Sequence, residues 1–133
     1  MSGAAGQRVG TRFVSLAEAL ALQALLCRRF GGDPAVVDPG LLEGALARCR
    51  SAHYASLSEQ AAALLHALAD EHPMASGNRR FAFALASTFL RLNGYRLQVS
   101  PAAAAHFLRE QVLARQANTR HIARALERTM RPF

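Results

Sequence analysis

Lysine is missing from this chain altogether, so all 16 basic residues are arginines. Nine acidic residues leave a formal net charge of +7 at pH 7. Charge of this size favours nucleic acid or an anionic membrane as a partner when it is clustered on one surface. Here the arginines are spread along the chain and alanine is abundant throughout, which is typical of compositional bias. We therefore expect neither nucleic acid nor a membrane to be the main partner.

Cysteine is also scarce, with two residues in the chain. Cys27 and Cys49 lie in apolar helical patterns and belong to no CxxC pair or histidine cluster, which argues against a zinc site and a disulfide framework. We expect two reduced core thiols in a cytoplasmic protein. No apolar run reaches membrane-spanning length, and Glu18 and Gln23 interrupt the stretch 16–27, so we do not expect secretion.

The size and hydrophobic content of the chain point to one buried core. With 133 residues, of which 51% are hydrophobic, a single domain is expected. Residues 1–12 are rich in glycine, alanine and serine and are predicted to be a flexible N-terminal segment, which leaves 13–133 as the domain. Apolar residues recur at helical spacing in six segments, so the predicted fold is a compact all-α bundle of six helices.

Polar residues that favour helix N-caps precede each of these six segments. The predicted N-caps are Ser15, Asp38, Ser56, Ser76, Ser100 and Asn118. The first helix is expected to stop at Gly31–Gly32, and the residues that follow one face at helical spacing are Leu16, Leu20, Gln23, Cys27 and Phe30. The sixth is expected to carry Met130 on its buried face. Residues 95–99 alternate briefly and predict a short strand or an extended link.

The run from His72 to Arg80, HPMASGNRR, joins the third helix to the fourth. His72 is the next helical step of an apolar stripe, so its imidazole is expected at the C-terminus of the third helix, facing inward. Arg79 and Arg80 fall in the first turn of the fourth helix, where the helix dipole disfavours cations unless an anion is bound. A structural histidine with two solvated arginines is the plainer alternative. Nothing in the run is acidic.

This run resembles the signature of the Fic superfamily, HxFx(D/E)GNxR, and most closely its Doc branch, the death-on-curing toxins, which read HxFx(D/N)GNKR. Other stretches resemble Doc-like proteins in the same order: FGG at 30–32, DPGLLE at 38–43, ALAR at 45–48, FL at 89–90 and NGY at 93–95. An ordered set of matches is more specific than one short motif. The resemblance implies a six-helix Fic/Doc-type bundle that acts as a transferase.

Carried over residue by residue, the resemblance implies that His72 is the general base toward a hydroxyl of a target protein. Gly77 and Asn78 would form a cradle for the phosphates of ATP or another nucleoside triphosphate, and Arg80 would hold those phosphates. Arg79 stands where Doc-like kinases have lysine and where nucleotidyl-transferring (AMPylating) relatives mostly have glycine. The resemblance therefore favours phosphoryl transfer over nucleotidyl transfer.

Two positions depart from the family pattern. Met74 replaces a phenylalanine that anchors the loop, and its flexible thioether is expected to fill a similar pocket. Ser76 replaces the acid that holds Mg²⁺, so metal binding is expected to be weak or absent at this position. A catalytically silent module that binds a nucleotide or a protein on the same fold is the alternative function.

The resemblance also implies partners. A translation component such as elongation factor Tu would be the protein substrate, and a small Phd-like antitoxin would regulate the toxin by covering its groove with a helical tail. His53 and Tyr54 fall between the second and third helices, where family members have a flap that docks the target segment. An ordinary polar loop is the alternative at this place.

Overall fold

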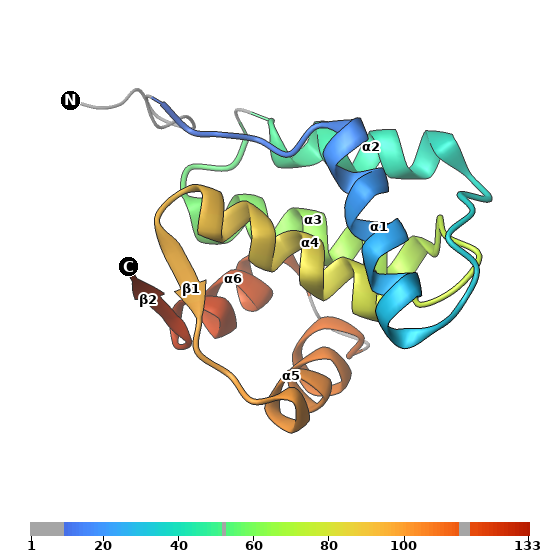
Figure 1. Ribbon diagram of the computed structural model, residues 1–133. Helices are drawn as coiled ribbons and strands as arrows, with labels where there is room; N and C mark the ends of the chain where they lie inside the picture. The colour runs from blue at the N-terminus through green and yellow to red at the C-terminus, as the bar shows by residue number, and fades with distance from the viewer. Residues whose placement is uncertain (1–9, 52, 115–117) are drawn as a thin grey trace.

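A computed structural model describes residues 10–51, 53–114 and 118–133, which form six α-helices, one π-helical turn and two short strands (Figure 1). In chain order these are α1 (Leu16–Phe30), α2 (Pro39–Cys49), α3 (Leu57–Glu71), α4 (Asn78–Leu92), β1 (Tyr95–Leu97), α5 (Pro101–Phe107), η1 (Leu108–Val112), α6 (Thr119–Glu127) and β2 (Met130–Pro132). The predicted all-α bundle is confirmed.

The predicted domain boundary falls close to the edge of the described chain. Residues 1–9 of the expected flexible segment lie outside the described residues. Arg12 is held to the domain, because its backbone N–H donates to Oδ1 of Asn93 at 2.9 Å and its guanidinium pairs with Glu18 at 2.7 Å. The division at residue 12 stays a prediction.

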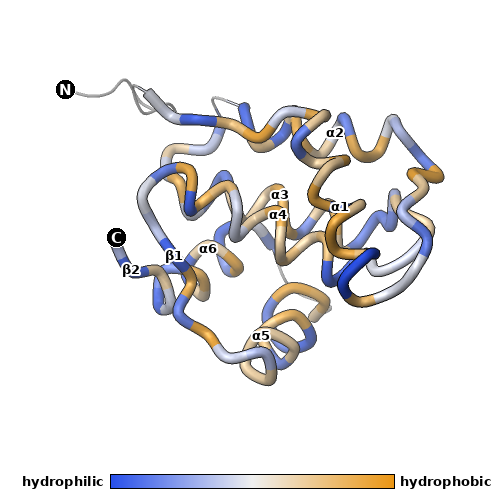
Figure 2. Tube along the Cα trace, in the orientation of Figure 1, coloured by the Kyte–Doolittle hydropathy of each residue, from blue (hydrophilic) through white to orange (hydrophobic). Residues whose placement is uncertain are grey.

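Hydrophobic and hydrophilic residues alternate along the helices rather than forming long separate stretches (Figure 2). This is the pattern of amphipathic helices that share one core. Within the described ranges, no helix combines the length and the apolar character needed to span a bilayer. Cys27 and Cys49 are both buried and free, as expected.

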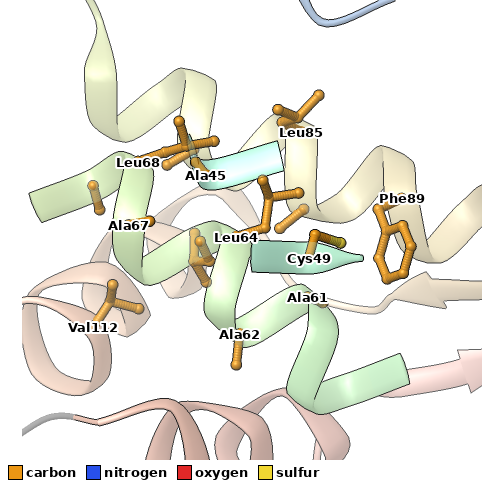
Figure 3. Packing of buried hydrophobic residues seen from close by; sticks show 14 of the residues in the cluster. Ala45, Cys49, Ala61, Ala62, Leu64, Ala67, Leu68, Leu85, Phe89 and Val112 are labelled. Atoms are coloured by element: carbon orange, nitrogen blue, oxygen red, sulfur yellow. The ribbon is translucent and has the colours of Figure 1, made fainter. Parts of the chain in front are cut away.

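The centre of the bundle is α3, which packs against α2, α4 and α6. Its sequence is rich in alanine and leucine, and small side chains let neighbouring helices approach closely while leucines fill the spaces between them. Figure 3 shows Ala61 and Leu64 of α3 beside Cys49 of α2 and Phe89 of α4. These side chains are at most 3% exposed, so α3 and α4 form a rigid base for the loop that joins them.

Five of the six predicted N-caps are confirmed. Each accepts a hydrogen bond from the backbone N–H three residues further on, and they are Ser15, Asp38, Ser56, Ser100 and Asn118. The prediction for Ser76 is wrong, because α4 begins one residue later with Gly77 as its N-cap. Gly77 has φ 64° and ψ 37°, a left-handed conformation that glycine adopts without strain.

The predicted buried face of α1 is only partly right. Leu16 and Leu20 are each 39% exposed and Phe30 is 63% exposed, whereas the polar Gln23 between them is fully buried. The core is reached by Ala19 instead, because α1 lies across α4 with one flank open. Gln23 lies between α1 and the loop that precedes α4, where its amide has a specific partner described below.

The C-terminal third differs from the prediction in two places. Met130 does not continue α6, since that helix ends at Glu127, and it pairs instead with Leu97 in an antiparallel ribbon of β1 and β2. The predicted fifth helix is present, but its second half is wound as the π-helical turn η1. The ribbon thus pairs the segment that follows α4 with the segment that follows α6.

Candidate active site

Two residues in left-handed conformation bracket the loop between α3 and α4. His72, the C-cap of α3, has φ 54° and ψ 60°, and Gly77 has the left-handed geometry given above. Positive φ is uncommon outside glycine. Pro73 explains why α3 ends before His72, because a proline disfavours the right-handed helical conformation of the residue before it.

The expectation that His72 faces inward is therefore wrong, although its position at the end of α3 is confirmed. The left-handed turn takes it off the apolar stripe of α3 and leaves it exposed, while Pro73 and Met74 are buried. An exposed imidazole at the start of the loop can reach a proton on a bound molecule, which an imidazole packed in the core cannot do.

Met74 anchors the loop as predicted, with 2% of its surface exposed. Asn78 holds the same residue from the start of α4. Its Oδ1 accepts from the backbone N–H of Met74 and its Nδ2 donates to the carbonyl of Met74, both at 2.9 Å. Both side-chain groups of Asn78 thus bond to Met74, which fixes the turn before α4 and leaves the backbone N–H of Asn78 free of any described partner at the helix start.

The first turn of α4 is a candidate anion-binding site. Within the described chain, α4 is the α-helix without a side-chain N-cap, whereas the other five each have one. Its first backbone N–H groups belong to Asn78, Arg79 and Arg80. Unpaired N–H groups and the positive end of the helix dipole favour an anionic ligand there.

The position without the expected acid, Ser76, makes two contacts that tie the loop to α1 and the segment after it. Its hydroxyl Oγ accepts from the backbone N–H of Asp33 at 3.1 Å, and its carbonyl accepts from Nε2 of Gln23 at 3.0 Å. Gln23 is fully buried, so this contact fixes the loop from within the fold. Gln23 was not predicted as a site residue. A polar side chain on an otherwise apolar helix face is the sequence feature that could have indicated this buried contact.

The segment Gly31–Asp38 borders the loop along its first half, as the right-hand side of Figure 1 shows. Val36 and Met74 form an antiparallel β-bridge. The carbonyl of Pro73 accepts from the N–H groups of both Val37 and Asp38, at 2.8 and 3.1 Å. Sequence patterns missed this pairing because it joins residues almost forty positions apart.

His53 and Tyr54 lie elsewhere. Their ring centroids are 5.1 Å apart in the link between α2 and α3. This link leads into the N-terminal end of α3. His72 follows the C-terminal end of that helix, and 15 residues of α-helix span roughly 22 Å. The structure does not bring the predicted docking flap to the loop, and a docking role for these two residues stays a prediction without support from proximity.

Arg80 is turned toward the C-terminal end of α1. Its Nη2 donates to the carbonyl of Gly31 at 3.0 Å and lies 3.6 Å from Sγ of Cys27, and its guanidinium lies 5.6 Å from the ring centroid of Phe30. The Nε atom is buried and has no partner among the described residues. A Cβ atom on Gly77 would lie 2.6 Å from Nη2, so only glycine allows this packing.

Arg79 is exposed and has no hydrogen bond or ion pair with any described residue. Together with Arg80 it borders a cavity of about 570 Å³ between α1, α4 and the α5–η1 region. Phe30, Phe83 and Leu108 contribute to a mainly apolar lining. A cavity of this size suits a small organic ligand, and the two arginines place positive charge at its edge.

Metal donors are few around the loop. Among the described residues, no group of three or more histidine, cysteine, aspartate and glutamate side chains could hold a metal ion. The loop itself has no carboxylate, and Ser76 already accepts a hydrogen bond through its hydroxyl. Any Mg²⁺ here would depend mainly on phosphate oxygens with at most one nearby carboxylate, a donor set that Mg²⁺ does accept.

The loop brings together an uncapped helix start, two arginines and an exposed histidine, the residue types that the sequence motif suggested. Residues 13–90 match the model of the Fic/DOC family, and the chain therefore belongs to this family. The match covers α1 to α4 and the loop, so every predicted site residue lies inside it.

A particular relative is the protein named Toxin Doc from Mycolicibacterium smegmatis (strain ATCC 700084 / mc(2)155). It is 45% identical over 73 residues, which correspond to 51% of this chain and 56% of the relative. The chain thus matches about half the length of this curated relative. Membership of the family supports a transferase-type enzyme, and the resemblance to the Doc branch is confirmed.

Proposed function

We propose that this protein is a Doc-like toxin of a toxin–antitoxin system, which transfers the γ-phosphoryl group of a nucleoside triphosphate to a hydroxyl side chain of a cytosolic protein. One observation carries the proposal: the exposed His72 and the uncapped N-terminus of α4 lie at the two ends of one short loop. This arrangement supports a mechanism in which a base and an anion-binding group act on the same substrate.

His72 acts as the general base. It accepts the proton of the target hydroxyl while the hydroxyl oxygen bonds to the γ-phosphorus. The bond from the γ-phosphorus to the bridging oxygen breaks, and the nucleoside diphosphate leaves with the bonding electrons. The backbone N–H groups of Gly77 and the first turn of α4 bind the phosphate oxygens, and Arg79 stabilises the charge on the transferred group.

Arg79 favours phosphoryl over nucleotidyl transfer. Arg79 is exposed in the first turn of α4, where a bulky cation restricts the space for an α-phosphate. Its planar guanidinium can also donate two hydrogen bonds to a terminal phosphate. Arg80 borders the same cavity and adds positive charge there. The nucleoside occupies the apolar part of the cavity, between Phe30 and Phe83.

The protein partners follow from the relationship to Toxin Doc. The proposed substrate is elongation factor Tu or a similar translation factor, and the proposed regulator is a Phd-like antitoxin. Phe30 is exposed at the C-terminal end of α1 and borders the cavity, so it gives an antitoxin helix an apolar side chain to pack on. A helix bound there would also cover the cavity beside Phe30 and block the nucleotide.

A silent module is the second candidate, and a specific observation favours it. The hydroxyl of Ser76 and one nitrogen of Arg80 are used inside the fold, which leaves fewer groups for catalysis than the family motif provides. In this case the site would bind a nucleotide or a protein without turnover.

One experiment separates the two. The purified protein is incubated with elongation factor Tu or a bacterial lysate and with ATP labelled at either the α- or the γ-phosphate. We expect γ-label on the target, with His72→Ala inactive and His121→Ala, a change of an exposed histidine on α6, unaffected. Mass spectrometry of the target then identifies the added group. Equal labelling by wild type and His72→Ala, or no labelling at all, contradicts the transferase.

A further inference from the structure

The segment beside the loop carries an acidic residue next to Ser76, the position where the family acid is missing. Asp33 follows Gly31 and Gly32 at the end of α1, and its backbone N–H donates to the hydroxyl of Ser76 at 3.1 Å. Gly32 has φ 111°, and a Cβ atom there would lie 2.9 Å from Cβ of Ser76 and 3.6 Å from Nη2 of Arg80. Only a glycine therefore lets this segment approach the loop so closely.

The segment that carries Asp33 is fixed to the loop on its far side as well. The backbone N–H of Ala75 donates to the carbonyl of Ala35 at 2.9 Å, and Val36 is bridged to Met74. Contacts at residues 33, 35 and 36 hold the segment against three consecutive loop residues. The carboxylate of Asp33 is thus carried on backbone that is positioned by the loop itself.

The carboxylate of Asp33 is available for a cation. Its Oδ1 accepts from the N–H of Ala35 at 2.9 Å, while Oδ2 has no hydrogen bond or ion pair with any residue that the structure describes. Asp33 is also exposed. An exposed carboxylate with one free oxygen, beside a phosphate site, is the type of donor that Mg²⁺ takes in addition to phosphates.

Other acids near the loop are less suitable. Glu71 pairs with Arg48 at 3.2 Å, and Asp38, the N-cap of α2, bonds to the loop at Pro73 rather than at Ser76. Asp70 lies on α3 before His72 and contacts no loop residue through any bond in the described chain. Asp33 is the acid whose own backbone touches Ser76.

We propose that Asp33 supplies, from the segment after α1, the carboxylate that binds the divalent cation of the nucleotide in place of the acid missing at Ser76. The proposal rests on the proposed function, because the cation comes to the site with the nucleotide phosphates. It assigns the metal-binding role to a residue outside the HPMASGNRR run.

The test measures Mn²⁺ binding by electron paramagnetic resonance, in the presence of a non-hydrolysable ATP analogue, for the wild type, Asp33→Asn and Asp70→Asn. Asparagine keeps the acceptor for the N–H of Ala35, so the fold is retained, and circular dichroism checks this. We expect Asp33→Asn to weaken Mn²⁺ binding at least about tenfold, while the matched control Asp70→Asn leaves it unchanged.

A double-mutant cycle sharpens the test. Ser76→Asp returns an acid to the loop and should restore Mn²⁺ binding in the Asp33→Asn background, so that the two changes are not additive. Unchanged Mn²⁺ affinity in Asp33→Asn, or a loss in Asp70→Asn alone, overturns the role of Asp33 and leaves the proposed function standing. Nucleotide analogue that binds equally with and without Mn²⁺ also overturns it. A wild type that binds no nucleotide under either condition overturns the proposed function as well.

Discussion

Asn78 shows how one side chain can hold a whole loop. Its two hydrogen bonds to the backbone of Met74 close the turn that presents the α4 N-terminus. We expect Asn78→Ala to lower the free energy of unfolding by about 1–3 kcal/mol, because Met74 loses both partners, and to weaken ATP binding. Urea unfolding and calorimetric titration measure the two effects.

Asn93 offers a matched control at the other end of α4. It bonds the N–H and the carbonyl of Arg12 and the carbonyl of Phe89. Asn93→Ala should destabilise the protein to a similar extent without changing ATP affinity. Equal losses of ATP affinity in the two variants would show that the effect of Asn78 is one of general stability.

Cys49 makes stability depend on pH at the alkaline end. Burial raises the pKa of its thiol to about 12 from an ordinary value of 9.0. The pKa of this thiol is higher in the folded state than in the unfolded state. Its contribution to the free energy of unfolding is therefore fully present below pH 9 and is lost as the pH rises toward 12. Between neutral pH and about pH 10.5 the wild type should lose roughly 2 kcal/mol more than Cys49→Ala. Urea unfolding at both pH values tests this, and parallel losses in the two proteins would contradict it.

For individual residues of the site, the anchoring role of Met74 was predicted, whereas the orientation of His72 and the contacts of Ser76 were not. The role of Met74 as an anchor was predicted from the family resemblance, because it stands at the position of an apolar phenylalanine that anchors the loop. The outward turn of His72 does not follow from helical spacing, because Pro73 alters the backbone of the preceding residue. The position of Ser76 depends on Asp33 and Gln23, two partners from distant parts of the chain.

Among the elements, those specified by local chemistry were the most predictable. An N-cap is a contact between residues three apart, so serine, aspartate and asparagine identified five helix starts. The β1–β2 ribbon and the pairing of 36 with 74 join segments far apart in the sequence, and no local pattern encodes them. The exposed flank of α1 was mispredicted for the same reason, because burial depends on which neighbours cover a face.

The β1–β2 ribbon contains a pair of like charges. Arg96 and Arg131 are directly opposite in its register, and both are exposed. Like charges across a strand pair are destabilising, whereas opposite charges contribute about 0.2–1 kcal/mol. We expect Arg96→Glu to raise the free energy of unfolding by about 0.5 kcal/mol at low salt, with a smaller gain for the neutral Arg96→Gln. Urea unfolding at low and high salt measures this, and a gain that salt does not reduce would contradict the electrostatic cause.

On the scale of the whole molecule, function and closure lie at opposite ends of α4. The loop and the segment Gly31–Asp38 form one end, and the β1–β2 ribbon closes the other. The family motif predicted which residues lie together at the first end, since the residues of a short loop stay together in space, but not the outward turn of His72 or the N-cap at Gly77. The second end consists of residues beyond the region matched by the family, and its pairing became visible only in the structure.

The positive charge of the molecule is the last feature with a testable consequence. Arg12 and Arg48 pair with carboxylates, and Arg80 is held against α1, so part of the net charge of +7 is used within the fold. The other arginines that the structure describes are divided among several helices and the ribbon, a distribution that favours few contacts with any one duplex. We expect a short DNA duplex to show no saturable binding at about 150 mM salt, measured by fluorescence anisotropy. Saturable binding that weakens steeply as salt rises would contradict this, because a steep slope requires many arginines to contact phosphates on one continuous face.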